Sequence, residues 1–312
     1  MKNKILVIGS INIDLVVYAH RHPIPGETIL GDHFSTFPGG KGANQAIAAA
    51  RLGGNVQMVG RLGKDTFGQA LLDNLRKNQV DSQSVVQVDK PTGTALITVD
   101  AKGQNSIIVV PGANATLTKA DIDRLRETIR DTKVLVLQLE IPLDVVIHAI
   151  NVAYQFGTTI LLNPAPAAQI PIETLRKVTY IVPNESELAL LSGIETDSFV
   201  NCRQAANHLF TLGCKQIILT RGEHGAYYLS PDHHIFAPSF KVPVLDTTAA
   251  GDAFIGGFAV AVAEDMDLHT ALLRASAAGA LAVTKAGAQT SLPLKSEVEA
   301  FLKKHKQEVK SI

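Results

Sequence analysis

Short runs of apolar, often β-branched residues recur along the chain, and stretches with helical character separate them. The runs cover Lys4–Ile8, Val134–Leu139, Thr159–Leu162, Tyr180–Val182 and Gln216–Leu219. Runs that are apolar at nearly every position are typical of strands covered on both faces. Helical stretches such as Leu143–Gln155 and Cys202–Leu212 lie between them. This alternation predicts an α/β fold with a central, mostly parallel sheet and right-handed crossovers.

Polar or glycine residues stand where four of these runs end. They are Gly9–Ser10, Gln138–Glu140, Asn163–Pro164 and Pro183–Asn184. In open α/β sheets, ligands bind outside the carboxyl ends of the strands. We therefore expect these side chains to lie along one edge of the sheet, at a common site.

Two other stretches, about residues 11–38 and 93–110, alternate apolar and polar residues in the manner of antiparallel strands. Neither is large enough to stand alone, so we interpret them as one small sheet that projects over the edge of the main sheet. Residues 1–312 then form a single domain with a lid, and the outer face of that lid needs a partner.

Composition narrows the class of protein. The 29 Lys and Arg residues balance 29 Asp and Glu residues, which disfavours nucleic acid and anionic membranes as partners. Only Cys202 and Cys214 are cysteines, and they lack the spacing of metal ligands, which favours a reducing compartment. No apolar run is long enough for a signal peptide or a membrane span. We expect a cytoplasmic protein.

The segment from Asp246 to Phe254 has the strongest chemical signature. It leads into a run of small and apolar residues up to Ala263, in which Asp252 is the only charge. A turn followed by a buried helix leaves backbone N–H groups free to bind an anion, and Gly251 permits close approach. Asp252 is then a base beside a phosphate, or simply a favourable acid in the first turn of a helix.

The segment Gly39–Ala46 is a second candidate, at the start of a helix that runs to Arg51. Its three glycines allow a ligand close to the backbone, with Lys41 and Asn44 supplying polar groups; a glycine-rich linker is the alternative. It is not a Walker A loop, because Gly-x-x-x-x-Gly-Lys-Ser/Thr occurs nowhere in the chain, and neither does Gly-x-Gly-x-x-Gly.

Three further positions carry weaker signals. Asn184 and Glu187 are three residues apart at a helix start, where they suit hydrated Mg²⁺ or form an ordinary cap. Glu140 either holds a sugar hydroxyl or caps the helix that follows Pro142. The turn Thr220–Gly225 ends a strand and offers backbone groups to a nucleotide.

Taken together, these blocks resemble the PfkB carbohydrate kinase family, and within it the ribokinases. The similarity extends over essentially the whole chain. It covers Gly9–Asp14, Gly39–Ala46, Thr92–Gly93, Gln138–Glu140, Asn163–Ala167, Pro183–Glu187, Asp246–Phe254 and Gly287–Gln289. The resemblance implies a three-layer α/β sandwich with a small β-sheet lid, and transfer of a phosphoryl group from ATP to the 5-hydroxyl of ribose.

The resemblance also implies roles for individual residues. Asp252 is the catalytic base, beside an anion hole of Ala249, Ala250 and Gly251. The sugar contacts are Asn12, Asp14, Gly39, Gly40, Lys41, Asn44, Glu140 and Asp252. The ATP contacts are Asn184, Thr220, Arg221, Gly222, Glu223, His224, Gly225, Gly251, Asp252 and Ser276. Asn184 and Glu187 organise Mg²⁺. A monovalent cation, usually K⁺, is held at Asp246, Thr248, Ala282, Lys285, Gly287 and Ser291.

Two positions leave alternatives open. Ribokinases commonly carry Asn where this chain has Ser276, which puts that adenine contact in doubt. Deoxyribokinases commonly carry Met where this chain has Asn12, and an amide that reads a hydroxyl favours ribose over 2-deoxyribose. Kinases for other small sugars or nucleosides, and a non-catalytic sugar sensor, are the remaining alternatives. Lid sheets in this family often pair, so we expect a homodimer.

Overall fold

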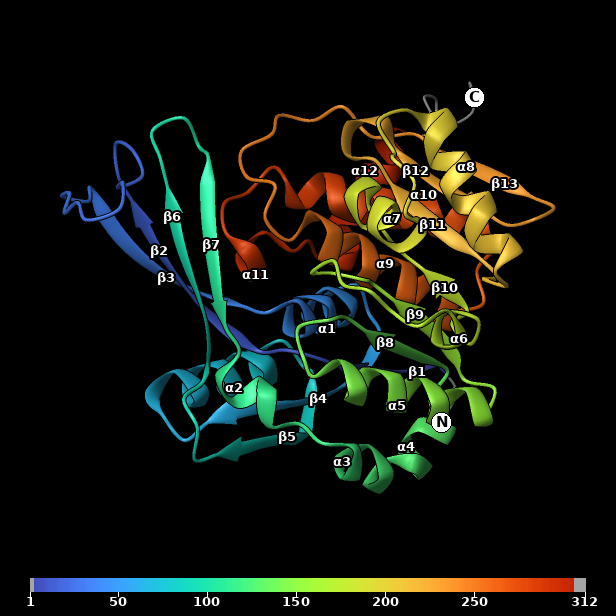
Figure 1. The fold of residues 1–312 in the computed structure, drawn as a ribbon, viewed down its shortest axis with the longest axis horizontal. Helices are drawn as coiled ribbons and strands as arrows, with labels where there is room; N and C mark the ends of the chain where they lie inside the picture. The colour runs from blue at the N-terminus through green and yellow to red at the C-terminus, as the bar shows by residue number, and fades with distance from the viewer. Residues whose placement is uncertain (1–2, 306–312) are drawn as a thin grey trace.

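The computed structural model describes residues 3–305, which form a large mixed sheet, helices on both of its faces and a small second sheet (Figure 1). The large sheet has nine strands in the order β13-β12-β11-β10-β9-β8-β1-β4-β5. Their bounds are β1 (Lys4–Ile8), β4 (Asn55–Gly63), β5 (Asp81–Val88), β8 (Val134–Leu137), β9 (Thr159–Leu162), β10 (Tyr180–Ile181), β11 (Ile217–Thr220), β12 (Ala226–Leu229) and β13 (His234–Ala237). The α/β class expected from the sequence is confirmed.

Two hydrophobic cores lie on the two faces of this sheet, and β1 shows why. Because side chains alternate along a strand, Ile5 and Val7 enter one core while Leu6 and Ile8 enter the other. All four side chains are fully buried. A strand covered on both faces must be apolar throughout, which is the pattern seen in the sequence.

The helices divide between the two cores. The first core includes residues of α1 (Lys41–Arg51), α2 (Thr66–Lys77), α9 (Ala250–Ala263), α10 (Leu268–Ala282) and α12 (Lys295–Lys304). The second includes residues of α3 (Lys119–Arg124), α4 (Arg126–Arg130), α5 (Leu143–Gln155), α6 (Ile172–Leu175), α7 (Glu185–Ser192) and α8 (Phe199–Thr211). The short helices α11 (Ala288–Ser291), η1 (Gly112–Thr116) and η2 (Gly222–His224) lie in connections. No helix within residues 3–305 is long and apolar enough to span a membrane.

Several predicted boundaries differ from the structure. The strand expected over Val134–Leu139 ends at Leu137, because the N–H of Leu139 turns to the carbonyl of Ala165. The runs Tyr180–Val182 and Gln216–Leu219 become Tyr180–Ile181 and Ile217–Thr220. Helix α8 begins at Phe199, three residues earlier than expected, because the Ser198 side chain caps it.

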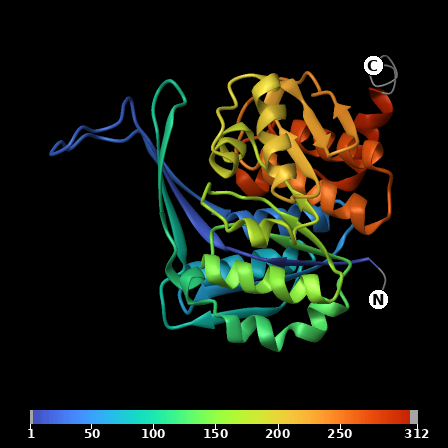
Figure 2. The same ribbon diagram turned by 45° about the vertical axis from the view of Figure 1, so that its right-hand side comes forward.

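The small sheet has four strands in the order β3-β2-β6-β7. Their bounds are β2 (Asn12–Tyr18), β3 (His33–Gly39), β6 (Gly93–Val99) and β7 (Asn105–Val110). The expected antiparallel pairs β2–β3 and β6–β7 are present, but β2 and β6 run parallel, so the sheet is mixed. Figures 1 and 2 both show its strands projecting from the main body. The register Asn12↔Gly39 and Asn12↔Gly93 places the root of this sheet at Asn12.

Candidate active site

A hollow of about 210 Å³ lies where strands of the large sheet end and α1 and α9 begin. Its lining comprises Lys41, Asn163, Ala165, Val182, Asn184, Glu187, Thr220, Thr247, Ala249, Gly251, Asp252 and Ile255. Many of the residues singled out in the sequence meet here. This edge is the one at which parallel strands present their carboxyl ends, as ligand sites in such sheets require.

Asp252 lies in the first turn of α9, with only 7% of its surface exposed. Asn44 donates to one carboxylate oxygen and Gln45 to the other, each at 2.9 Å. Burial raises the pKa of Asp252, while the charge of Lys41 and these two hydrogen bonds act in the opposite direction. A buried carboxylate that only accepts hydrogen bonds is oriented to take up a proton from a bound hydroxyl.

Lys41 is the first residue of α1 and lines the same hollow. Burial lowers the pKa of its ammonium group, but four carboxylates outweigh that and raise it above the ordinary value. They are Asp252, Glu140, Glu187 and Asp14. One cation among these acids remains charged, so it can attract a phosphate to this edge.

The turn before α9 supplies backbone donors. Ala249 has a left-handed conformation, with φ of 59°, which is unusual for a residue with a side chain. The N–H of Ala250 donates to the carbonyl of Thr247 at 3.3 Å. Within residues 3–305, no acceptor serves the N–H groups of Gly251 and Asp252, and a Cβ built on Gly251 would meet open space. Two free donors at a helix start form an anion site.

The predicted sugar contacts of the small sheet lie at the root of β2. Asn12 is 2% exposed, and its Oδ1 accepts a hydrogen bond of 2.7 Å from Asn114. Asp14 lies two residues further along the strand. Burial and the nearby charges of Glu140 and Asp252 raise the pKa of Asp14 to about 7, against the lowering effect of Lys41.

The glycines before α1 allow close packing within the chain itself. A Cβ on Gly40, whose φ is +86°, would stand 2.6 Å from the backbone nitrogen of Asn12. A Cβ on Gly42 would stand 2.6 Å from that of Ser10, and one on Gly39 would meet the Asp14 carboxylate at 2.2 Å. These glycines therefore bring the start of α1 against Ser10, Asn12 and Asp14.

Glu140 does not cap the helix after Pro142, which was one of the two alternatives for it, but contacts the start of α1. Its Oε2 accepts from the Ser10 hydroxyl and, at 3.0 Å, from the N–H of Lys41 at the start of α1. The helix after Pro142, α5, has no side-chain cap. Glu140 thus links the segment after β8 to α1, and its charge helps to raise the pKa of Lys41.

Asn184 and Glu187 form a capping box at the start of α7. The side chain of Asn184 accepts from the N–H of Glu187 at 2.9 Å, and the Glu187 carboxylate accepts from the N–H of Asn184 at 2.9 Å. The ordinary cap considered in the sequence is therefore present. Both side chains also line the hollow, and burial raises the pKa of Glu187.

The turn Thr220–Gly225 is only partly at the hollow. Thr220 lines it and bridges to Asn184, since β11 ends beside the chain that follows β10. Arg221 turns to Glu185 at 2.8 Å and lies over the ring of Phe199. The η2 residues Gly222, Glu223 and His224 follow, and Ser276 is half-buried on α10; none of these four lines the hollow.

The two segments expected to hold a monovalent cation are joined by Asp246. One of its oxygens accepts from the N–H of Thr248 at 2.9 Å and the other from the N–H of Gly287 at 2.8 Å. These hydrogen bonds outweigh burial and lower the pKa of Asp246. The ammonium of Lys285 pairs with Glu297, which leaves only its carbonyl for a cation. An ionised carboxylate among backbone oxygens suits a hard cation.

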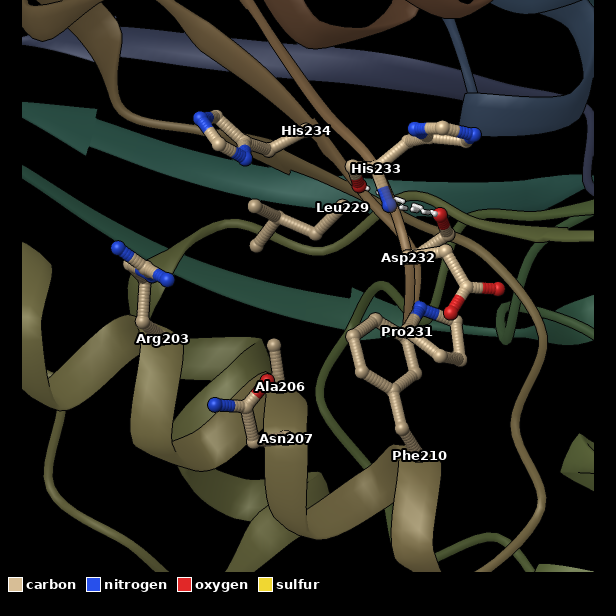
Figure 3. A pocket seen from close by; sticks show the side chains of 10 residues that line it. Arg203, Ala206, Asn207, Phe210, Leu229, Pro231, Asp232, His233 and His234 are labelled. Atoms are coloured by element: carbon tan, nitrogen blue, oxygen red, sulfur yellow. Dashed lines mark hydrogen bonds between the residues drawn. The ribbon is translucent and has the colours of Figure 1, made fainter.

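A second hollow, of about 250 Å³, lies between α8 and the β12–β13 turn. In Figure 3, Arg203 and His234 lie at one end of it, and Phe210 and Pro231 at the other. Because β12 runs antiparallel to β11, with Ile217 opposite Leu229, this hollow lies at the amino end of β11. It is therefore at the opposite edge of the sheet from Asp252.

The sequence did not indicate the contacts of three buried amides, although it did place Asn163 at the common edge of the sheet, where it lines the hollow. Gln45 contacts Asp252 directly, Gln289 donates to Asn44 at 3.0 Å, and Asn163 accepts from Gln45 at 3.2 Å. Each is at most 8% exposed. A buried amide needs partners, but a sequence does not show which residues from distant segments provide them.

Comparison with known protein families matches residues 2–295 to the pfkB family carbohydrate kinase. The chain belongs to this family. A match of nearly the whole chain covers all the segments that form the hollow. Membership identifies the chain as an ATP-dependent sugar phosphotransferase.

Individual relatives are similar to the chain over nearly its whole length. The chain is 42% identical to the ribokinase of Bacillus subtilis (strain 168) over 303 residues, which are 97% of this chain and 100% of that protein. It is 39% identical to the deoxyribokinase of Salmonella typhi, over 96% and 98% of the two chains. One bifunctional relative is longer, and this chain spans 55% of it.

A solved structure shows the same architecture. The structure of Arabidopsis thaliana ribokinase complexed with ribose and ATP has a TM-score of 0.89 and 35% sequence identity to this chain. The match covers 97% of this chain and 99% of that one.

Proposed function

We propose that this chain transfers the γ-phosphoryl group of ATP to the 5-hydroxyl of D-ribose, giving ribose 5-phosphate and ADP. The observation that carries the proposal is the buried Asp252 carboxylate, which lies in the same helical turn as two free N–H groups and beside the charged Lys41. The ribokinase relatives and the ribokinase bound to ribose and ATP support this choice of substrates.

Each group has a defined part in the reaction. Asp252 takes the proton of the 5-hydroxyl as that oxygen bonds to the γ-phosphorus and the bond to ADP breaks. The N–H groups of Gly251 and Asp252 stabilise charge on the transferred group, and Lys41 attracts it. Glu187 and Asn184, which line the hollow, would hold Mg²⁺ through its water shell, and the ion would supply positive charge to neutralise the ATP phosphates.

Asn12 supports ribose over 2-deoxyribose. Because Asn114 donates to its Oδ1, the Asn12 amide is fixed, and no acceptor within residues 3–305 serves its nitrogen, which can donate to a sugar hydroxyl. A site with such a polar group discriminates against a substrate that lacks the hydroxyl. Deoxyribose phosphorylation is the second candidate, because a deoxyribokinase is almost as similar to the chain.

Three finer proposals complete this function. A monovalent cation, K⁺, binds between Asp246 and the carbonyls near Gly287 and fixes the turn before α9. The reaction takes place in the cytoplasm, where ATP is abundant. The small sheet closes over the sugar and pairs with that of a second copy, because all six residues of β7 are exposed and four of them are Ile or Val.

A coupled assay of ADP release tests the substrate assignment. Ribose, 2-deoxyribose, fructose and adenosine are compared at equal concentrations with saturating ATP and Mg²⁺. We expect the highest kcat/KM for ribose. A higher kcat/KM for 2-deoxyribose would replace the first candidate with the second, and sugar binding without ADP release would indicate a sensor.

A further inference from the structure

The orientation of Asn44 next to Asp252 is set by a series of other amides. An amide can present either its nitrogen or its oxygen to a neighbour, and only the nitrogen stabilises an ionised carboxylate. Asn44 presents its nitrogen to Asp252, and its own oxygen accepts from Gln289 Nε2 at 3.0 Å. The oxygen of Gln289 in turn accepts from Asn74 Nδ2 at 2.5 Å.

The series continues to a guanidinium group. Asn74 Oδ1 accepts from Asn78 Nδ2 at 3.3 Å, and Asn78 Oδ1 accepts from Arg51 Nε at 2.8 Å. The amide relay is defined here as Arg51, Asn78, Asn74 and Gln289. It leaves α1 at Arg51, crosses α2 and α11, and returns to α1 at Asn44.

The two ends of this series fix its direction. A guanidinium only donates hydrogen bonds, so Asn78 must present its oxygen to Arg51 and its nitrogen to Asn74. Each following amide is oriented in the same way. Its oxygen accepts from the nitrogen of the amide before it, so its own nitrogen must face the next residue. At the far end the Asn44 nitrogen must face Asp252.

The other carboxylate oxygen of Asp252 also accepts from an amide whose orientation is fixed by its neighbours. Gln45 donates to it, while Gln45 Oε1 accepts from Gln138 Nε2 at 2.6 Å. Asn163 accepts from Gln45 and donates to the carbonyl of Val182, which fixes its direction too. Within residues 3–305 the buried Oε1 of Gln138 has no partner, so this orientation is kept although it leaves an acceptor unsatisfied.

We propose that the amide relay is a positioning device, which holds the Asn44 nitrogen toward Asp252 and thereby keeps Asp252 in its ionised, proton-accepting form. The proposal rests on the function above only in treating Asp252 as the base. None of the four relay residues lines the hollow, so they act through Asn44 rather than on the substrate.

The charges around Asp252 explain why such a device matters. Burial and the carboxylates of Glu140, Asp14 and Glu187 disfavour a further negative charge at this edge. Lys41, on α1, is the cation that opposes them. The donors from Asn44 and Gln45 also favour the ionised form of Asp252.

The substitution Asn74→Asp reverses the relay with the smallest possible change. A carboxylate at 74 only accepts, so Gln289 must turn its nitrogen toward it and its oxygen toward Asn44, which then presents its own oxygen to Asp252. We expect the pKa of Asp252 to rise by about one unit, the scale of one hydrogen bond to a charged group. The pKa is measured from the ¹³C carboxyl resonance of labelled protein, assigned with Asp252→Asn.

Two controls separate the relay from the added charge. Asn151→Asp places the same charge on a half-buried residue of α5, where Asn151 accepts from Lys177, and should leave the pKa of Asp252 unchanged. In the background of Gln289→Met the relay is broken, so Asn74→Asp should add little to the shift. An equal shift in both backgrounds, or no shift in the native background, would overturn the proposal.

Two further measurements keep the outcomes distinct. If Asn74→Asp does not fold, as judged by circular dichroism, Asn78→Asp is the second variant. It should reverse the orientation of the same amides from a position one step further along the relay from Asp252. The acidic limb of kcat/KM for ribose should move to higher pH with the NMR value, while KM for ATP stays the same. A shift of the Asp252 pKa in a protein that phosphorylates no sugar would support the relay and refute the proposed function.

Discussion

Asp252 and Asp14 are two carboxylates of one site, but they are held in different ways. Asp252 lies between α9 and α1 and accepts hydrogen bonds from Asn44 and Gln45 on its two oxygens. Asp14 lies on β2 of the projecting sheet, and within residues 3–305 nothing donates a hydrogen bond to its side chain; its pKa is raised to about 7. The proposed base is thus preorganised by the main body, whereas the carboxylate of Asp14 lacks hydrogen-bond donors, which sugar hydroxyls can supply.

The largest effect should follow from removing the base. Asp252→Asn keeps the shape of the side chain, so we expect kcat to fall by roughly 10²–10⁴-fold, the range for a positioned general base. Binding of ATP, measured by calorimetry, and the melting temperature should change little. If the variant keeps most of its kcat, Asp252 is not the base, and the main body does not carry the chemistry.

A smaller effect should follow at the root of the small sheet, at Asn12. We expect Asn12→Met to lower kcat/KM for ribose relative to 2-deoxyribose by about 10- to 100-fold, the scale of one lost hydrogen bond to a hydroxyl. Both sugars are measured in both proteins. A ratio that does not change would mean that Asn12 does not read the 2-hydroxyl, so substrate choice would lie elsewhere.

The titration of Asp14 tests the contrast with Asp252 directly. Below its folded pKa of about 7, Asp14 is protonated and is a poorer acceptor for sugar hydroxyls. KM for ribose should therefore rise as the pH falls from 8 to 6, by at most about tenfold per unit. Asp14→Asn should have a KM that is flat over this range. A native KM independent of pH would show that an ionised Asp14 is not needed.

The pH dependence of the free energy of unfolding provides a second test of the raised pKa of Asp14. Because the folded pKa lies above the ordinary 3.8, the folded protein holds a proton that the unfolded chain releases. The free energy of unfolding should fall as the pH rises from about 4 to about 7, by up to roughly 4 kcal/mol. In Asp14→Asn this contribution should disappear, which urea titrations at both ends of the range would measure.

A structural feature could be predicted from the sequence when the residues that determine it are close together in the chain. Strands β1 and β9 and helix α5 were predicted residue for residue, and the end of α1 at Arg51 was predicted too, because their apolar patterns and boundaries are local. Strands β4, β5, β12 and β13 were not predicted. The strands β5 and β13 keep polar or half-exposed residues and lie at the two edges of the large sheet.

The residues of the candidate site also divide into those that a short motif indicates and those whose contacts depend on tertiary packing. Asp252, Lys41 and Asn44 stand in short motifs, so the sequence indicated them. Gln45 lies within such a motif, but its contact with Asp252 spans 207 positions and depends on how α1 packs on α9. The alternative that Glu140 caps the helix after Pro142 was wrong for the same reason, since its partner Lys41 is 99 positions away.

The proposed monovalent cation should have a moderate effect on kcat, because its proposed site at Asp246 lies at the turn before α9 and away from Asp252 itself. We expect K⁺ to raise kcat over Na⁺ or tetramethylammonium at equal ionic strength, and Asp246→Ala to reduce this activation. Steady-state rates in the three chloride salts are the measurement. Equal rates in all three salts would leave Asp246 as a link between Thr248 and Gly287 with no role in binding a cation.

The smallest effect on chemistry should come from the outer part of the small sheet. Strand β7 is an edge strand, and Ile108 is 66% exposed on it, which leaves backbone groups and apolar surface for a second copy. Ile108→Lys should shift the mass measured by light scattering from dimer to monomer, with kcat changed by less than about twofold, since Asp252 and its amides lie in the main body. Lys102→Ile, at the nearby turn, removes a charge without touching β7 and should leave the dimer intact. A native protein that is monomeric at all concentrations would refute pairing of the small sheets. A large fall in kcat in the monomeric variant would show that the small sheet positions the reacting groups as closely as the main body does.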